Sequence, residues 1–321
     1  MKEINELYSR QLNEWEFARQ NYEGLKNVTI KTFQISRHNW HVQFNPKRII
    51  STAAKIDQKS LNDRPCFLCE NNRPPEQEAF SWREYVVLLN PYPVFDRHFT
   101  IPTTRHIPQL IHGRFRDMLS LAEELDDSVI IYNGPKCGAS APDHMHFQAI
   151  PRNLLPVETG FDTAIQEAVC GSTRLYRWED FLSHPVTLTS NDPEELALIF
   201  EMVYHWLKRL IIQPVGVRLD LTEFDHEPMI NMLALYNHNR WVVHVFPRKS
   251  HRPRQYFAEE PEKIFISPGT IDMGGVLVMP REEDYNKISA SDIIDIMEQV
   301  CMDEEFIIKL INEIKKEYDS I

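Results

Sequence analysis

The stretch from Asn133 to Gln148 constrains the fold more than any other part of the sequence. It reads Asn-Gly-Pro-Lys-Cys-Gly-Ala-Ser-Ala-Pro-Asp-His-Met-His-Phe-Gln. Its end alternates polar and apolar residues, and successive side chains of a strand point to opposite faces of the sheet. We therefore predict a strand with His144, His146 and Gln148 on one face, and with the methionine and phenylalanine between them in the core.

A glycine-rich loop precedes these histidines. Its glycines and Ser140 allow backbone N–H groups to approach an anion closely, as phosphate-binding loops require. Neutral imidazole is a nucleophile near pH 7, so a histidine beside such a loop is placed to attack phosphorus. An isolated His-x-His is more often only a polar strand face, whose rings meet solvent or a buried carboxylate. The neighbouring loop favours the nucleophile.

Composition narrows the class of protein. Hydrophobic residues make up 42% and charged residues 26% of the 321-residue chain, which is typical of a folded soluble protein. The 47 acidic against 35 basic residues give a net charge of -12, which disfavours nucleic acid as a partner. We expect neither a membrane span, which needs roughly 20 apolar residues, nor a signal peptide, and therefore a cytoplasmic location. The five cysteines are then predicted to be reduced thiols.

The hydrophobic periodicity predicts an α+β fold, mainly antiparallel sheet flanked by helices. Helices are expected from Ile4 to Leu25 and at 114–125, 193–211, 290–300 and 304–318. Strands are expected around 28–35, 40–44, 85–89, 99–101, 129–132, 144–150, 229–235, 241–246, 263–266 and 276–279. These elements form two blocks with a polar, proline-flanked junction at 185–193. We predict two related halves, residues 1–188 and 189–321, packed as one unit.

The motif Asn-Gly-Pro…Gly-Ala-Ser…His-Met-His-Phe-Gln resembles the active-site motif of the histidine triad superfamily, in the branch with Gln at the third position. That branch holds galactose-1-phosphate uridylyltransferase, diadenosine tetraphosphate phosphorylase and GDP-galactose phosphorylase. Two further segments are similar in order and spacing: Cys66–Cys69 with Asn72, and Asn90–Pro93 through His106. The resemblance implies two histidine-triad-like halves, the first with nucleophile and metal motif, the second without the triad motif.

The resemblance also implies roles for individual residues. His146 matches the nucleophile that becomes nucleotidylated, and Gln148 matches the amide that holds the phosphoryl oxygens. The substrate-binding positions it implies, together with a lysine that would offset phosphate charge, are Arg48, Asn90, Asn133, Lys136, Gly138 and Ser140. The spacing from Ser140 to His146 is one residue longer than in the uridylyltransferases. Arg48 is equally well explained as a solvated basic residue at a strand end.

Cys66-x-x-Cys69 has the spacing of two thiolates at adjacent corners of a tetrahedral zinc site. A reduced pair that packs or does redox chemistry is the alternative. The resemblance implies that His106 and His144 complete a structural zinc site. The second metal site of the uridylyltransferases needs a His-x-His that this chain lacks, since only His244 is kept. We expect His244 to be packed or to face phosphate.

Other segments bear on the substrate. Pro91 replaces the acidic residue that follows the uridine-contacting Asn, whereas Asp272–Gly275 and Pro280–Tyr285 are more similar to the purine-handling phosphorylases. A basic run at 248–254 either binds phosphate or is a solvated face.

We therefore predict a nucleotidyltransferase or phosphorylase acting on a nucleoside diphosphate sugar or a dinucleoside polyphosphate, with phosphate or a sugar phosphate as acceptor. The alternatives are a hexose-1-phosphate uridylyltransferase and a non-catalytic nucleotide-binding regulator. A homodimer is compatible with these features.

Overall fold

The computed structural model describes residues 2–49, 58–212 and 227–321. Its helices are α1 Lys2–Glu14, α2 Glu16–Glu23, α4 Gln58–Asp63, α5 Phe115–Glu124, α6 Pro156–Thr159, α7 Pro193–Leu207, α8 Arg254–Phe257, α9 Thr270–Met273, α10 Glu282–Lys287, α11 Ala290–Val300 and α12 Glu304–Tyr318. Its strands are β1 Thr29–Ile35, β2 His38–Phe44, β3 Ala79–Trp82, β4 Tyr85–Leu89, β5 Phe99–Pro102, β6 Ser128–Asn133, β7 His146–Pro151, β8 Ala164–Cys170, β9 Thr173–Trp178, β10 Val186–Ser190, β11 Ile230–Asn237, β12 Arg240–Pro247 and β13 Val276–Met279.

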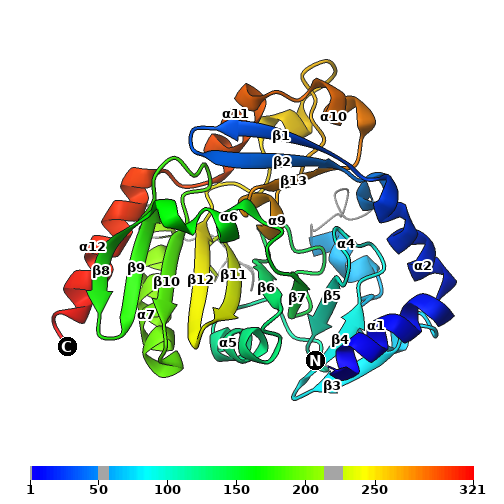
Figure 1. Ribbon diagram of the computed structural model, residues 1–321, viewed down its shortest axis with the longest axis horizontal. Helices are drawn as coiled ribbons and strands as arrows, with labels where there is room; N and C mark the ends of the chain where they lie inside the picture. The colour runs from blue at the N-terminus through cyan, green and yellow to red at the C-terminus, as the bar shows by residue number, and fades with distance from the viewer. Residues whose placement is uncertain (1, 50–57, 213–226) are drawn as a thin grey trace.

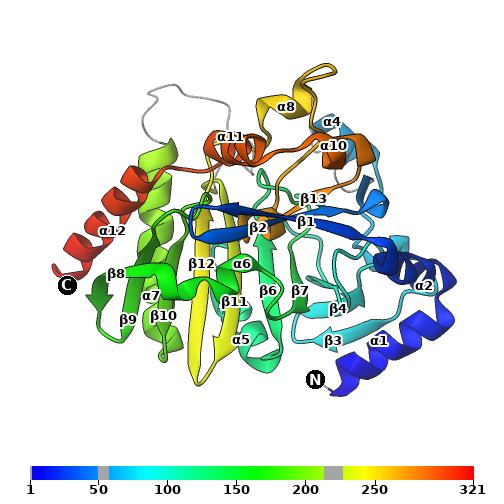
Figure 2. The same cartoon turned by 45° about the horizontal axis from the view of Figure 1, so that its top comes forward.

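The strands form two sheets (Figure 1). The large sheet has ten strands in the order β3-β4-β5-β7-β6-β11-β12-β10-β9-β8, and every neighbouring pair is antiparallel. In the small sheet, β2 pairs antiparallel with β1 and parallel with β13, and this sheet crosses the strands of the large one (Figure 2). Strands β6 and β11, from the two predicted halves, pair directly, so the halves share one sheet.

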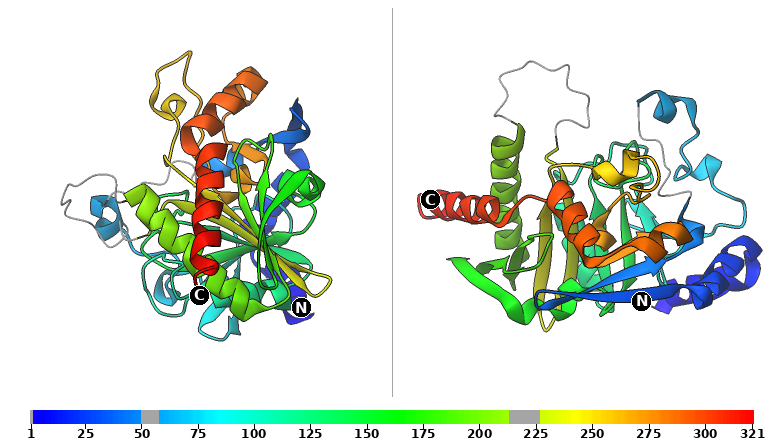
Figure 3. Two further views of the ribbon diagram at one scale, coloured as in Figure 1. Left: turned by 90° about the vertical axis from the view of Figure 1, so that its left-hand side faces the viewer. Right: turned by 90° about the horizontal axis from the view of Figure 1, so that it is seen from above.

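Each face of the large sheet is covered by a separate hydrophobic core. One core holds Ile130, Met232 and Val243 with residues of α5, α7 and α12. The other holds Ile131 and Leu233 with residues of β2, β13 and α11. Because neighbouring strand residues alternate between the two cores, β6 and β11 are buried on both faces. Helices α7 and α12 pack against each other beside β8, β9 and β10 (Figure 3).

Local sequence signals explain where several helices begin. The carboxylate of Asp192 accepts from the backbone N–H groups of Glu194 and Glu195 at the start of α7. Ser289 caps α11 in the same way, and Asp303 caps α12 by accepting from Phe306. Each cap supplies acceptors for N–H groups that have no partner within the helix.

Most predicted elements are present, whereas the short helices α4, α6, α8, α9 and α10 were not predicted. The N-terminal helix is interrupted at Trp15, which is buried and has extended backbone angles. The strand predicted at 263–266 is wrong: the Phe265 N–H donates to the Asp284 carboxylate instead of a strand. Strands β3, β8, β9 and β10 were not predicted. The loop preceding β7 includes His144, so the strand begins only at His146.

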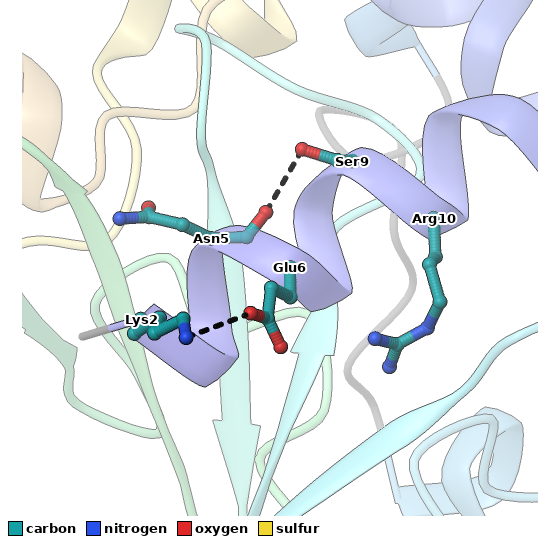
Figure 4. Close-up of a pocket in the computed structure, with 5 residues that line it drawn as sticks. All are labelled: Lys2, Asn5, Glu6, Ser9 and Arg10. Carbon is teal, nitrogen blue, oxygen red and sulfur yellow. Dashed lines mark hydrogen bonds and ion pairs between the residues drawn. The ribbon is translucent and has the colours of Figure 1, made fainter.

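The structure also describes the surface of α1. Lys2, Asn5, Glu6, Ser9 and Arg10 line a shallow hollow there, where Lys2 and Glu6 form an ion pair of 3.9 Å and Ser9 donates to the Asn5 carbonyl (Figure 4). These contacts are ordinary ones between successive turns of an exposed helix. Among the described helices, none combines the length and the apolar character needed to cross a bilayer.

Candidate functional site

A cavity of about 800 Å³ lies between the large sheet, the glycine-rich loop and the segment 251–278. It is lined by polar and apolar side chains from both predicted halves. They include Trp15, Phe17, Arg48, Arg64, Phe67, Asn90, Tyr92, Asn133, Gly138, Ser140, His146, Gln148, His251, Arg252, Ser267, Thr270 and Asp272. A volume of this size accommodates a small-molecule ligand such as a nucleotide. The cavity therefore brings together most of the predicted substrate-binding residues and both predicted catalytic ones.

His146 opens strand β7 at the wall of this cavity. Its Nδ1 lies 2.8 Å from the carbonyl oxygen of His144, and its backbone N–H donates to Gln109 Oε1. A carbonyl only accepts, so Nδ1 carries the proton and Nε2 keeps its lone pair. Burial lowers the pKa of His146 to about 4, which keeps the ring neutral near pH 7. The residue is only 4% exposed, so its ring reaches the cavity from a buried position.

Gln148 lies two residues farther along β7, and its amide is oriented by His98. The Val94 N–H donates to His98 Nδ1 over 3.2 Å, so Nε2 of that ring carries the proton and donates to Gln148 Oε1 over 2.8 Å. Burial lowers the pKa of His98 to about 3, so the ring stays neutral. With its oxygen bound to His98, Gln148 has its NH₂ group available as a donor to the cavity.

The glycine-rich loop is held against the C-terminal half. Gly138 has a φ of +95°, and a Cβ there would lie 2.9 Å from Gly269 Cα, so this position requires glycine. The Asn133 side-chain oxygen accepts from the Thr270 N–H and from Asn231 Nδ2, at 2.8 and 3.0 Å. Asn133 is therefore occupied in joining the two halves, while Ser140 lines the cavity.

The other predicted substrate-binding residues differ in position. Arg48 lines the cavity and donates to the Tyr92 carbonyl over 2.6 Å, and burial lowers its pKa to about 10. Asn90 also lines the cavity, donating to Thr100 Oγ1 and accepting from the Tyr92 N–H. Lys136 does not line the cavity. The structure thus brings Arg48 and Asn90 to the site but not Lys136.

The four predicted metal ligands form one cluster. The ligand atoms of Cys66, Cys69, His106 and His144 all lie within 4.8 Å of one another. Cys66 Sγ and Cys69 Sγ are 3.3 and 3.5 Å from His144 Nδ1, and Cys69 Sγ is 3.2 Å from His106 Nδ1. Because His144 Nε2 donates to the Thr103 carbonyl, the lone pair of that ring is on Nδ1, toward the thiols. A Cys₂His₂ set with a fixed tautomer fits tetrahedral zinc.

Two residues whose roles the sequence did not decide, Arg248 and His244, are buried. Arg248 is fully buried and donates to Asn231 and to the carbonyls of Val300 and Pro268, so it is structural. His244 is packed: its Nδ1 lies 2.8 Å from Thr187 Oγ1.

Sequence reasoning missed His98 and Gln109, which hold Gln148 and His146. It also missed two aromatic side chains of the cavity, Phe17 and Phe67, which are 45% and 47% exposed. One signal for His98 was available in the sequence. It is a polar residue two positions before Thr100, and Thr100 is the residue of β5 that pairs with Gln148.

Comparisons with known proteins agree with this architecture. Residues 7–151 match the family model "Domain of unknown function (DUF4922)", and residues 226–320 match "GDPGP1-like, C-terminal domain". No curated protein matches the sequence. Yeast Ap4A phosphorylase Apa2 is structurally similar, with a TM-score of 0.50 and 15% identity over 90% of this chain and 94% of that chain. The chain shares this fold.

The predicted α+β class is thereby confirmed, and the predicted resemblance agrees with the GDPGP1-like model at residues 226–320 and with the fold shared with the phosphorylase. The GalT-like protein from Arabidopsis thaliana is a more distant match, with a TM-score of 0.35 and 11% identity over 84% of this chain and 99% of that chain. The division into halves at residues 188 and 189 stays a prediction.

Proposed function

We propose that the protein is a nucleotidyltransferase or phosphorylase that acts on a nucleoside diphosphate sugar or a dinucleoside polyphosphate through a covalent nucleotidyl-His146 intermediate. The observation that carries this proposal is the His146 ring. Its Nδ1 is bound to the His144 carbonyl, burial lowers its pKa, and the residue lines a cavity of nucleotide size. The shared fold with a yeast Ap4A phosphorylase and the GDPGP1-like family model support this class of substrate.

In the first step, Nε2 of His146 attacks the α-phosphorus, and the bond from phosphorus to the bridging oxygen breaks. The electron pair leaves with the sugar phosphate or nucleotide, while the Nδ1 proton stays on the ring and its partial charge is stabilised by the His144 carbonyl. In the second step, an acceptor phosphate displaces Nε2. The NH₂ group of Gln148 donates to a phosphoryl oxygen throughout, because His98 holds the amide in that orientation.

The cysteine–histidine cluster supports the nucleophile indirectly. The imidazole ring of His144 belongs to the cluster, and the backbone carbonyl of the same residue accepts from His146 Nδ1. Zinc bound by Cys66, Cys69, His106 and His144 would cross-link the loop at 66–69 to the residue that fixes the tautomer of His146. We propose a structural role for this metal.

The aromatic side chains of the cavity suit a nucleobase. Phe17 and Phe67 expose large ring surfaces at the cavity, and base–aromatic stacking is favourable for every base. We therefore place the base toward Phe17 and Phe67 and the phosphates toward His146. The cytoplasmic location and the homodimer remain predictions.

The test uses substrates labelled at the α-phosphorus. Wild-type protein should acquire an acid-labile, base-stable label, as expected for a phosphoramidate, and His146→Ala should acquire none and lose turnover by far more than tenfold. Turnover of His146→Ala within about tenfold of wild type, a difference of about 1.4 kcal/mol, contradicts the mechanism. Nucleotide binding without label in the wild type would instead identify a non-catalytic binder. A screen of nucleotide sugars and dinucleotides, with and without phosphate, identifies the base and the acceptor.

A further inference from the structure

Helix α1 lies beside β3 and β4, and together with α2 it holds two loops that line one end of the cavity (Figure 1). The buried amide of Gln11 in α1 donates to the Glu76 carbonyl over 2.8 Å and accepts from the Glu78 N–H over 3.2 Å. The amide of Asn21 in α2 donates to the Pro91 carbonyl over 2.8 Å. Both loops are therefore fixed in place by the N-terminal helices, and their side chains form a preformed wall.

This end of the cavity lies two strands away from the nucleophile. Gln77 Nε2 donates to the Leu89 carbonyl of β4 over 2.9 Å, and only β5 separates β4 from β7, which carries His146. Neighbouring strands are about 4.8 Å apart, so the two places are separated by about 10 Å. Phe17 packs edge-on against Tyr92 here, with ring centroids 5.7 Å apart. A nucleotide with its α-phosphorus at His146 can thus place its base at this end.

The Glu76 side chain brings a negative charge to this end of the cavity. In the part of the chain that the structure describes, its carboxylate has neither a hydrogen bond nor an ion pair. Asn72 and Gln77, which also line the cavity, direct their NH₂ groups to the carbonyls of Cys66 and Leu89, so their acceptor oxygens are left for a ligand. A carboxylate repels phosphate, so it suits a part of the ligand that carries N–H donors.

The four bases differ in the donors on their pairing edges. Guanine presents N1–H and N2–H₂ side by side, and two adjacent donors match the two oxygens of one carboxylate. Adenine and cytosine have a ring nitrogen with a lone pair beside the amino group, and uracil has carbonyl oxygens on both sides of its N–H. Each of these three bases would turn a lone pair toward the carboxylate, which disfavours its binding.

We propose that Glu76 determines the base specificity of the cavity by accepting from N1–H and N2–H₂ of guanine, so that the substrate is a guanine nucleotide. This inference rests on the proposed function and names the base that the proposed function leaves open. Phe17 packs against the plane of the base, and the oxygens of Asn72 and Gln77 are further acceptors beside it. Glu76 takes no part in the transfer itself, because it lies two strands from His146.

The test measures the affinity of the full chain for nucleoside diphosphates by titration calorimetry. Wild type should bind GDP at least about tenfold more tightly than ADP or UDP, because the wrong bases leave the carboxylate without its donors. IDP, which lacks only the N2 amino group, should bind less tightly than GDP by about fivefold or more, since it loses one hydrogen bond to a charged group. Wild-type affinities for GDP, ADP and UDP within about twofold of one another would overturn the proposal.

Replacement of the carboxylate by an amide should change the preference in a defined direction. A glutamine side chain offers one acceptor and one donor, which match the amino group and N1 of adenine, so Glu76→Gln should lower the ratio of GDP to ADP affinity at least about tenfold. Glu78→Gln is the matched control, because Glu78 pairs with Arg10 at 2.9 Å and is not among the residues that line the cavity. A GDP to ADP ratio for Glu76→Gln within about twofold of the control refutes the role of Glu76.

Binding and labelling together separate this inference from the proposed function. A GDP preference that depends on Glu76 in a protein that never acquires label at His146 supports the inference and contradicts the proposed function. Equal labelling of wild type by α-labelled guanine, adenine and uracil nucleotides supports the proposed function and contradicts the inference. Thermal unfolding checks that each variant folds. If Glu76→Gln does not fold, Glu76→Ala replaces it and should lose the preference for GDP over IDP, because no carboxylate is left to accept from N2–H₂.

Discussion

Replacing the amide of Gln148 by a carboxylate tests the orientation that His98 imposes. In the Gln148→Glu variant, His98 Nε2 donates to one carboxylate oxygen, as it does to Oε1 of the amide over 2.8 Å. The other oxygen then replaces the NH₂ group at the cavity. A donor to the phosphoryl oxygens becomes a negative charge beside them, with almost no change in shape. We expect this variant to fold and to lose nearly all nucleotidylation of His146.

The loss has two parts with different magnitudes. Removing a hydrogen bond donated to a charged oxygen costs about 1.5–3 kcal/mol, and Gln148→Ala measures this part alone. Two unit charges about 4 Å apart repel by about 4 kcal/mol at an effective dielectric constant of about 20. Since 1.4 kcal/mol corresponds to a factor of ten, the repulsion should lower kcat/KM about a further 10³-fold beyond the alanine variant.

The assay is single-turnover labelling of His146 at about pH 8, where a carboxyl group is ionised. Thermal unfolding of both variants checks that the fold is kept. Lowering the pH should narrow the gap between the two variants, because protonation of the carboxylate removes the repulsion. If Gln148→Glu and Gln148→Ala are labelled at rates within about threefold of each other at pH 8, Gln148 does not face the phosphoryl group, and the argument from His98 is wrong.

Two further predictions concern the metal cluster and the loop. Purified wild-type protein should contain about one equivalent of zinc per chain. Cys69→Ser should lose the zinc, whereas Cys170→Ser, at a buried cysteine outside the cluster, should keep it. Elemental analysis that finds zinc retained by Cys69→Ser would refute the predicted metal site. Gly138→Ala should destabilise the protein by about 1–3 kcal/mol from its positive φ and should also slow turnover, because the new Cβ pushes against Gly269. Gly113→Ala, at a φ of +75° with open space around it, should show the destabilisation in denaturant titrations but normal kcat/KM, and equal effects of both on kcat/KM would contradict a role for the loop.

Elements with strong local signals could be predicted from the sequence. Helices α11 and α12 have the predicted bounds, because each combines an apolar periodicity with a capping Ser289 or Asp303. The hairpin β8–β9, in which β8 is an edge strand of the sheet, was missed: charged residues such as Glu167, Arg174 and Arg177 take exposed or half-buried positions in it, and its sequence has no continuous apolar run. Tertiary contacts, which no short window contains, determine that part of the fold.

The candidate site also contains residues that local sequence patterns predict and residues whose positions depend on tertiary contacts. The period of two correctly places Met145 and Phe147 in the core and His146 and Gln148 at the cavity. It does not reveal that His144 leaves the strand, since this depends on the Met145 N–H donating to Ile107. Nor does it identify His98, which directly precedes the neighbouring strand β5 and binds Gln148 from there. The residues that we expect to touch the ligand lie in recognisable sequence motifs. The residues that orient them lie elsewhere in the sequence and come close only when the strands pair.

The connections between the strands also bear on how the chain folds during synthesis. Strand β2 pairs in parallel with β13, joining His41 to Val276, and β6 pairs with β11, joining Asn133 to Asn231. During translation, the β1–β2 hairpin and β6 therefore each keep one edge of unpaired backbone groups until most of the chain has been synthesised. Such high contact order predicts slow folding and dependence on chaperones. It also means that a truncated polypeptide has no complete active site, because residues 251–278, which line the cavity, belong to the last third of the chain.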